Sequence, residues 1–309
     1  GVEVRLLYDG MGCIRLPRHF FRPLQEAGGQ VACFFPPFLP YINLRINYRN
    51  HRKICVVDGR VAYVGGFNIG NEYLGLSKMG YWRDTHVKIE GSAVMGLAFR
   101  FLLDWRFAAQ DYSPVEEKYF PYCGKNGETA VQIVSSGPDS QWASIKNGYL
   151  KMISSARQRL YIQTPYFIPD ESILEALRVA ALSGVDVRLV IPEKEDHLFV
   201  HWASLSYMGG LLEAGVNCYT YKKGFIHSKM LVMDGLVSSL GTANLDMRSF
   251  YFNFEVNAFI YDENISSQLE AIFMRDLDDC EELTLEQYQQ RPVNVKIKEA
   301  FSRLLSPLL

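Results

Sequence analysis

The feature that most constrains this chain is a group of five polar and glycine residues that occurs twice with the same internal spacing. The first group is His51, Lys53, Asp58, Gly65 and Asn68, and the second is His227, Lys229, Asp234, Gly241 and Asn244. Each member of the second group follows its counterpart by 176 positions. Chance does not keep five positions in register, so the sequence predicts a duplicated unit that carries a duplicated site.

The repeat also predicts how the chain is divided. A length of 309 residues fits about two domains of ordinary size. We expect a first domain over 1–110, a linker rich in charge, proline and glycine over 111–129, and a second domain over 130–309. Gly1–Leu7 matches Gly184–Val190, but only the second copy has a strand and a helix before the match. We therefore expect the first domain to be incomplete at its N-terminus.

Hydrophobic periodicity predicts an α/β fold. In the second half, apolar runs typical of strands (131–134, 160–163, 185–191) alternate with amphipathic segments typical of helices (141–156, 171–182, 198–214). Asp58-Gly59 and Asp234-Gly235 each lie between two apolar runs and predict β-hairpins. The His and Lys before each turn are two positions apart, so on a strand both side chains point to one face.

The composition limits the kinds of binding partner and the cellular compartments that fit this chain. The net charge of −2 includes no basic excess, which disfavours nucleic acid as a partner without excluding a nuclease. The six cysteines show no metal-ligand spacing, as expected for reduced thiols in a cytosolic environment. No run approaches the roughly 18 apolar residues that cross a bilayer, and no signal peptide opens the chain. By itself the chain is expected to be soluble or peripheral to a membrane.

The repeated residue types suit phosphoryl transfer. Phosphodiesters resist attack because their anionic oxygens repel nucleophiles, so a catalyst must neutralise charge and supply a proton. Lys53 and Lys229 can neutralise the charge, and Asn68 and Asn244 can donate to non-bridging oxygens. One neutral imidazole can attack phosphorus while the other, protonated, serves the leaving oxygen. This chemistry predicts a covalent phosphohistidine and needs neither a metal nor a cofactor.

Four carboxylates near the motifs have open roles. Asp58 and Asp234 either take part in catalysis or hold the hairpin ends, because an Asp before a Gly is common turn chemistry. A catalytic histidine also needs its second ring nitrogen held, normally by a carboxylate. We expect Asp84 to orient His51 and Glu255 to orient His227. The alternative is that these two carboxylates only pair with nearby arginines, Arg83 and Arg248.

The two His-x-Lys-x-x-x-x-Asp motifs, with the Gly-Gly-Phe-Asn and Gly-Thr-Ala-Asn segments that come after them, resemble the phospholipase D superfamily. Five further segments resemble the bacterial cardiolipin synthase family: Tyr48–Lys53, Gly66–Gly70, Tyr81–Asp84, Gln163–Phe167 and Asn244–Ser249. The resemblance spans nearly the whole chain. It implies two phospholipase D-like α/β domains related by pseudo-twofold symmetry.

The same resemblance implies a metal-independent phosphatidyltransferase without a cofactor. One phosphatidylglycerol would give its phosphatidyl group to a histidine and release glycerol, and a second phosphatidylglycerol would accept the group to form cardiolipin. By analogy with relatives, His51 is the nucleophile and His227 the acid and base, although the near-symmetry of the halves leaves these roles exchangeable. The resemblance also implies a place at the bacterial cell membrane, with peripheral catalytic domains.

Two other functions stay open from the sequence. One is a phosphodiesterase of the same superfamily that hydrolyses phospholipid or nucleic acid. The other is a catalytically silent module that binds membranes. Two apolar segments bear on the choice: Pro36–Ile42 is either a loop packed on its own core or an apolar lip that admits acyl chains. Val293–Leu309 is either a helix docked on the domain or an amphipathic helix that lies on a bilayer.

Overall fold

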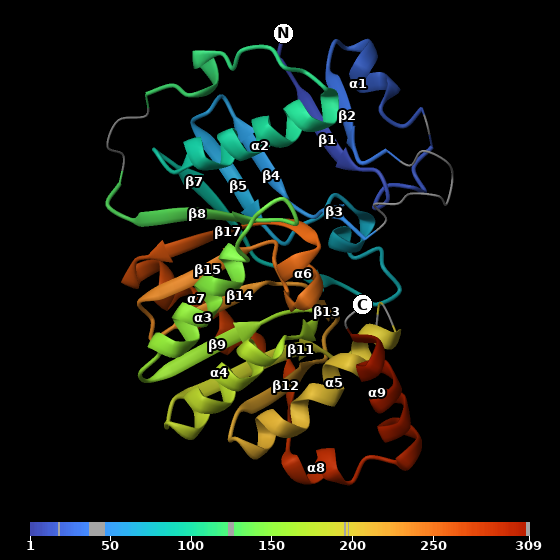
Figure 1. Ribbon diagram of the computed structural model, residues 1–309, viewed down its shortest axis with the longest axis vertical. Coiled ribbons are helices and arrows are strands. Elements are labelled where there is room, and N and C mark those ends of the chain that lie inside the picture. Colours follow the sequence, from blue (N-terminus) through green and yellow to red (C-terminus); the bar gives the residue numbers. More distant parts are fainter. Residues whose placement is uncertain (18, 37–46, 123–126, 195, 197, 307–309) are drawn as a thin grey trace.

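The structure is a computed structural model that describes the chain except residues 18, 37–46, 123–126, 195, 197 and 307–309. The predicted lip at Pro36–Ile42 therefore lies almost entirely outside the described residues. In Figure 1 the elements of the first half lie above those of the second, and β8 (Ala130–Ser136) and β17 (Asn253–Tyr261) pass between them. Helices and strands are mixed in both halves, which confirms the predicted α/β class.

The second half is built on a nine-stranded mixed sheet. Its parallel strands are β9 (Arg159–Gln163), β11 (Asp186–Pro192) and β12 (Asn217–Tyr221). Antiparallel strands β14 (Met230–Met233), β15 (Val237–Gly241) and β17 come next in order from β9. The sheet is completed by β18 (Cys280–Leu283) beside β12 and by β8 and β3 (Arg49–Asn50) beside β17.

Helices cover both faces of this sheet because its strands carry apolar side chains on both sides. On β9, Leu160 and Ile162 face one core, which is completed by α3 (Ser144–Ser155), α4 (Glu171–Leu182) and α5 (Leu198–Glu213). Tyr161, between them, faces the other core, which is completed by α7 (Glu263–Leu277). The sheet is thus a layer buried between two hydrophobic cores.

The first half has smaller sheets. Strands β1 (Arg5–Asp9) and β2 (Gln30–Phe34) are parallel, and β4 (Ile54–Val57), β5 (Val61–Gly65) and β7 (His86–Glu90) form an antiparallel sheet. Helix α2 (Val94–Ala109) packs on them, and a common core joins Val64 and Leu97 of this half to Val256 and Ala258 of β17. The two halves therefore share a hydrophobic core. The division at 111–129 stays a prediction.

Both predicted hairpins are present, as β4–β5 and β14–β15. The φ angles of their central residues are +53° and +65° at Asp58-Gly59, and +54° and +68° at Asp234-Gly235. Two successive residues with positive φ define the type I′ turn, whose twist matches that of a hairpin and which favours Asp-Gly.

The remaining elements are short or lie at the surface. They are α1 (Arg22–Glu26), η1 (Asn71–Leu74), β6 (Trp82–Arg83), η2 (Glu117–Tyr119), β10 (Phe167–Ile168), β13 (Phe225–Ile226), β16 (Leu245–Asp246), α6 (Met247–Tyr251), α8 (Leu285–Gln289) and α9 (Val293–Leu305). Within the described residues, no helix has both the length and the apolar character needed to cross a membrane.

Candidate active site

Two very short strand pairs bring the halves together at the motifs. Strand β3, which leads into His51, pairs in parallel with the start of β17 in the second half. Strand β13, which leads into His227, pairs in parallel with β6 in the first half. The backbone N–H of His51 donates to Phe254 O at 3.0 Å, and that of His227 donates to Arg83 O at 2.7 Å. The same pairing thus occurs twice with the halves exchanged, as an approximate twofold relation requires.

This exchange corrects the expected pairing of histidines with carboxylates. Nδ1 of His51 lies 2.9 and 3.0 Å from the two carboxylate oxygens of Glu255, and Nδ1 of His227 lies 2.8 Å from Oδ2 of Asp84. We expected the opposite assignment, within each half. It is wrong because each histidine-bearing strand pairs with the strand of the other half that leads into a carboxylate. An ionised carboxylate only accepts, so Nδ1 carries the proton and Nε2 is left for chemistry.

The alternative, that these carboxylates pair only with arginines, is also wrong. Arg83 forms an ion pair with Asp276 at 2.8 Å, and Arg248 donates to Asn47 O at 3.2 Å.

Each carboxylate is supported by a different set of neighbours. Glu255 is fully buried and accepts from Thr242 Oγ1 at 2.5 Å and from Asn253 Nδ2 at 3.1 Å. The Tyr73 hydroxyl lies 3.0 Å from Oδ2 of Asp84 and 2.7 Å from Nδ1 of His227. Sequence reasoning did not find Tyr73, because it has no counterpart in the second motif. The two imidazoles therefore sit in related but unequal environments.

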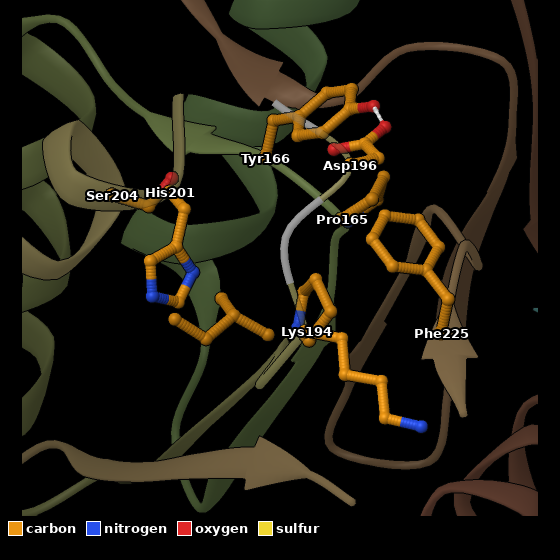
Figure 2. Close-up of a pocket in the computed structure, with 9 residues that line it drawn as sticks. Pro165, Tyr166, Lys194, Asp196, His201, Ser204 and Phe225 are labelled. Atoms are coloured by element: carbon orange, nitrogen blue, oxygen red, sulfur yellow. Dashed lines mark hydrogen bonds between the residues drawn. The ribbon is translucent and has the colours of Figure 1, made fainter. Parts of the chain in front are cut away.

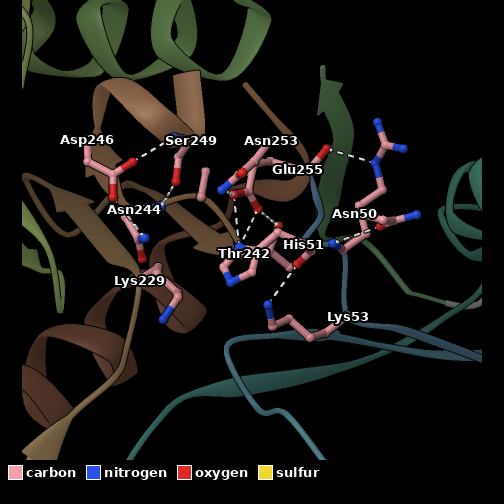
Figure 3. A network of polar contacts seen from close by, with 12 residues as sticks. Asn50, His51, Lys53, Lys229, Thr242, Asn244, Asp246, Ser249, Asn253 and Glu255 are labelled. Carbon is pink, nitrogen blue, oxygen red and sulfur yellow. Dashed lines mark hydrogen bonds and ion pairs between the residues drawn. The ribbon is translucent and has the colours of Figure 1, made fainter. Parts of the chain in front are cut away.

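The lysines converge on the same centre from both halves. Nζ of Lys53 donates to His51 O at 2.8 Å, and Nζ of Lys229 donates to His227 O at 2.5 Å. Figure 3 shows the His51 ring between the ends of these two lysine side chains. Burial lowers the pKa of each lysine and Glu255 and Asp84 both oppose it, so both lysine charges interact with both carboxylates. The two lysines of the repeated motifs thus belong to one site.

Burial lowers the pKa of the four basic groups of the site, and neighbouring positive charges add to this effect at His51, Lys53 and His227. Burial lowers the pKa of Lys53 to about 7 and that of Lys229 to about 8. Burial, with the charge of Lys229, lowers the pKa of His227 to about 3. Burial also lowers the pKa of His51, although Glu255 opposes it. A bound phosphodiester anion would favour the charged form of all four groups, so the site gains electrostatically when such an anion enters.

The two histidines differ in access. The side chain of His51 keeps 27% of its surface exposed, whereas that of His227 keeps 5%.

Asp58 and Asp234, grouped with the catalytic residues from the sequence, lie away from this centre. Asp234 accepts the backbone N–H groups of Arg157, Gln158 and Arg159 at 2.9, 2.8 and 2.9 Å. The whole of β14 separates it from Lys229, which at ~3.3 Å per residue amounts to about 16 Å. Asp58 occupies the equivalent turn and is exposed. Asp234 thus joins its turn to the start of β9, and Asp58 lies at the tip of the equivalent hairpin.

The two asparagines also differ. Asn244 is buried, donates through Nδ2 to Asp246 at 3.0 Å, and lies beside Lys229 in Figure 3. Its Oδ1 has no partner among the described residues. Asn68 is exposed on the segment that joins β5 to η1. Only Asn244 is thus held at the centre, by Asp246, a buried residue whose pKa burial raises.

Arg52 lies between the motif histidine and lysine, in the segment that joins β3 to β4, and it connects the site to α2. Its Nε donates to Glu255 O at 3.1 Å, and its Nη1 lies 2.8 Å from both oxygens of Asp104 on α2. Arg52 and Asp104 side chains are 2% and 4% exposed. The pair fixes the backbone of Glu255 relative to α2.

A small pocket adjoins the site at the carboxyl end of β11. Tyr166, Lys194, Asp196, His201 and Phe225 contribute to its lining, and Tyr166 donates to Asp196 (Figure 2). Phe225 connects the pocket to the centre, because it precedes His227 by two residues on β13.

The chain is similar to known proteins along its whole length. The family described as "Cardiolipin synthase, PLD-like domain" matches residues 1–90 and 149–277. The chain is 55% identical over 311 residues to the "Major cardiolipin synthase ClsA" of Bacillus subtilis (strain 168), and covers 64% of that protein. It is 53% identical over 314 residues to the "Cardiolipin synthase" of Listeria welshimeri, again with 64% covered. Both alignments use 100% of this chain, which thus spans somewhat less than two thirds of these relatives.

A solved structure shows the same fold. The phosphatidylserine synthase of Haemophilus influenzae Rd KW20 aligns with a TM-score of 0.67 at 16% identity, over 99% of this chain and 90% of that one.

Proposed function

Because the chain belongs to the cardiolipin synthase family with phospholipase D-like domains, we propose that it transfers a phosphatidyl group between two phosphatidylglycerol molecules and releases glycerol. One observation carries this proposal: two imidazoles, each held at Nδ1 by a carboxylate of the opposite half, share a centre with two lysines. That set of groups supplies a nucleophile, a proton donor and charge neutralisation for a phosphodiester.

In the first step, Nε2 of His51 attacks phosphorus and the bond to the glycerol oxygen breaks. His227 gives its proton to that oxygen, so neutral glycerol leaves. Glu255 stabilises the positive charge that develops on the His51 ring. His51 is assigned the attack because its greater exposure leaves room for the phosphatidyl group.

In the second step, a terminal hydroxyl of another phosphatidylglycerol attacks the phosphohistidine. Neutral His227 removes the hydroxyl proton, the new P–O bond forms and the P–N bond breaks. Cardiolipin results and both imidazoles return to their starting states. Since one phosphodiester replaces another, no nucleotide is consumed.

Substrate binding favours the proton that His227 needs for the first step. In the free site its pKa of about 3 keeps it neutral at pH 7. The anionic phosphodiester offsets the charges of Lys53 and Lys229, and a nearby anion raises the pKa of an imidazole. Asn244 and the two lysines would hold the non-bridging oxygens, while Asp58 and Asn68 have no direct part.

The experiment is a product assay on phosphatidylglycerol in detergent micelles. The parent chain is expected to give cardiolipin and glycerol. His51→Ala and His227→Ala are expected to lose at least about a thousandfold in kcat, as removal of a nucleophile or its partner does elsewhere. His19→Ala, on an exposed loop, is the matched control. Phosphatidic acid as the sole lipid product would instead support the hydrolytic alternative.

The proposal also covers domain organisation and location. Domains over 1–110 and 130–309 with a linker over 111–129 would place one motif in each, and a lipid substrate requires the catalytic domains to work at a membrane surface. A catalytically silent module would be the conclusion if labelled phosphate from the substrate were trapped on neither histidine in a chain that still folds.

A further inference from the structure

The amphipathic helix α9 (Val293–Leu305) is docked on the protein with its polar side inward. Glu299, Ser302 and Ser306 next to it are buried. Glu299 pairs with Arg291 at 2.8 Å, and Ser306 Oγ lies 3.1 Å from Tyr207 Oη on α5. Of the two roles the sequence left open for this segment, docking on the domain is present, and these polar contacts contribute to it. Figure 1 shows α9 at the edge of the molecule, beside α5.

The opposite side of α9 is an exposed apolar stripe. Val293, Ile297, Phe301 and Leu304 are 72%, 63%, 57% and 79% exposed. Their spacing of four, four and three residues keeps them on one face. At about 100° per residue, the centre of the stripe lies roughly 180° from the buried polar face. A helix of a soluble protein normally buries such a stripe. Its exposure on α9 therefore indicates a surface that contacts another protein or a membrane.

Cations flank this stripe on both sides. Lys296 and Arg303 lie at one border and Lys298 at the other, each about 100° from its centre. Nζ of Lys296 donates to Gln289 O, while Lys298 and Arg303 lie over the rings of Trp202 and Tyr207. None of the three forms an ion pair within the described part of the chain, so their charges are uncompensated by nearby carboxylates.

From the stripe and its flanking cations we infer that α9 is the surface by which the catalytic unit lies on an anionic phospholipid bilayer. Apolar side chains would enter the boundary between headgroups and acyl chains, and the cations would meet anionic headgroups. A second protein copy would also cover apolar side chains, but positive borders on both partners would then face each other. The inference rests on the proposed function in that a lipid substrate makes such a surface useful.

The test is co-flotation of the chain with vesicles. Ile297→Ser with Phe301→Ser is expected to weaken binding to vesicles of phosphatidylglycerol and phosphatidylcholine at least about tenfold. The matched control is Val179→Ser with Leu182→Ser on α4, where the side chains are 52% and 73% exposed. Its vesicle binding is expected to equal that of the parent. All four side chains are exposed, and thermal unfolding checks that each variant folds.

A charge variant separates the two parts of the surface. Lys296→Gln with Lys298→Gln is expected to weaken binding severalfold on vesicles that contain phosphatidylglycerol and to leave binding to pure phosphatidylcholine unchanged. Equal flotation of the stripe variant and the parent, or no flotation of the parent, overturns the inference. So does a parent dimer that the stripe substitutions convert to a monomer while vesicle binding persists.

An activity assay in detergent micelles tests the proposed reaction independently of vesicle binding. The stripe variant is expected to keep the parent's micelle activity, because α9 carries no group of the active site. If the parent chain binds vesicles but makes no cardiolipin in micelles, the proposed function is wrong, whereas the inferred role of α9 in membrane binding is retained.

Discussion

His51 and Glu255 lie 204 positions apart, yet Nδ1 of the first is 2.9 Å from Oε1 of the second. The mirror contact joins His227 to Asp84. Each reactive imidazole is therefore oriented by the half of the chain to which it does not belong. The site exists only when the halves are packed together, and their shared core makes that packing part of folding.

Replacement of Glu255 by Gln tests this relation. The amide still fills the space but loses the charge that stabilises a cationic His51 ring, so kcat is expected to fall by roughly 10–100-fold. Steady-state kinetics on phosphatidylglycerol micelles measure it. Glu270→Gln, which removes a carboxylate from the peripheral ion pair with Arg159, is the control. Equal kcat values for the two variants would contradict the orienting role.

The pH dependence of kcat/KM reports on the free site. Lys53 with a pKa of about 7 and Lys229 with a pKa of about 8 bind the substrate anion only while protonated. As pH rises through these values the charges are lost, so kcat/KM is expected to fall above about pH 7. Lys53→Arg stays charged and should extend the active range upward if it remains active. A parent profile that is flat from pH 7 to 9 would refute the assignment.

Asp234→Ala is expected to lower stability rather than the chemical rate. The carboxylate accepts three backbone N–H groups, and loss of hydrogen bonds to a charged group costs about 1–3 kcal/mol each when unreplaced by water. Because the turn is partly exposed, the total is expected near the lower end of that range. Urea denaturation gives the free energy of unfolding. Per folded molecule, kcat should match the parent, whereas Lys229→Ala should be nearly inactive.

Asp104→Ala is expected to destabilise the chain strongly, because it leaves the buried Arg52 guanidinium without its carboxylate. Breaking a buried ion pair from one side costs about 3–5 kcal/mol. A surface pair gives the contrast: Glu26→Gln beside Arg22 should change the free energy of unfolding by under about 1 kcal/mol. Similar denaturation midpoints for the two variants would contradict a stabilising role for the ion pair between Asp104 and Arg52.

Part of this structure could be predicted from the sequence, because it depends only on residues that are close together in the chain. Asp58-Gly59 and Asp234-Gly235 specify type I′ turns by themselves, and the alternating apolar runs specify the strands and helices of the second half. The exchange of carboxylates could not be read in the same way. It depends on β3 and β13, strands of two residues that have no periodicity and whose partners are far away in the chain.

The roles of Tyr73 and Arg52 could not be predicted from the sequence for a related reason. Tyr73 contributes only in the first half, so comparison of the two repeats gives no sign of it. Arg52 was visible inside a motif, but its role depends on Asp104, which lies on a helix whose position no local pattern predicts.

The reciprocal exchange of carboxylates has a consequence for symmetry. If the two halves were identical, each would give the same neighbours to the other's histidine, and both imidazoles would be equivalent. The halves of this chain differ in sequence, so that equivalence does not hold. Thr242 and Asn253 now serve one carboxylate and Tyr73 the other, so the paired imidazoles are free to specialise, one to attack and one to carry the proton.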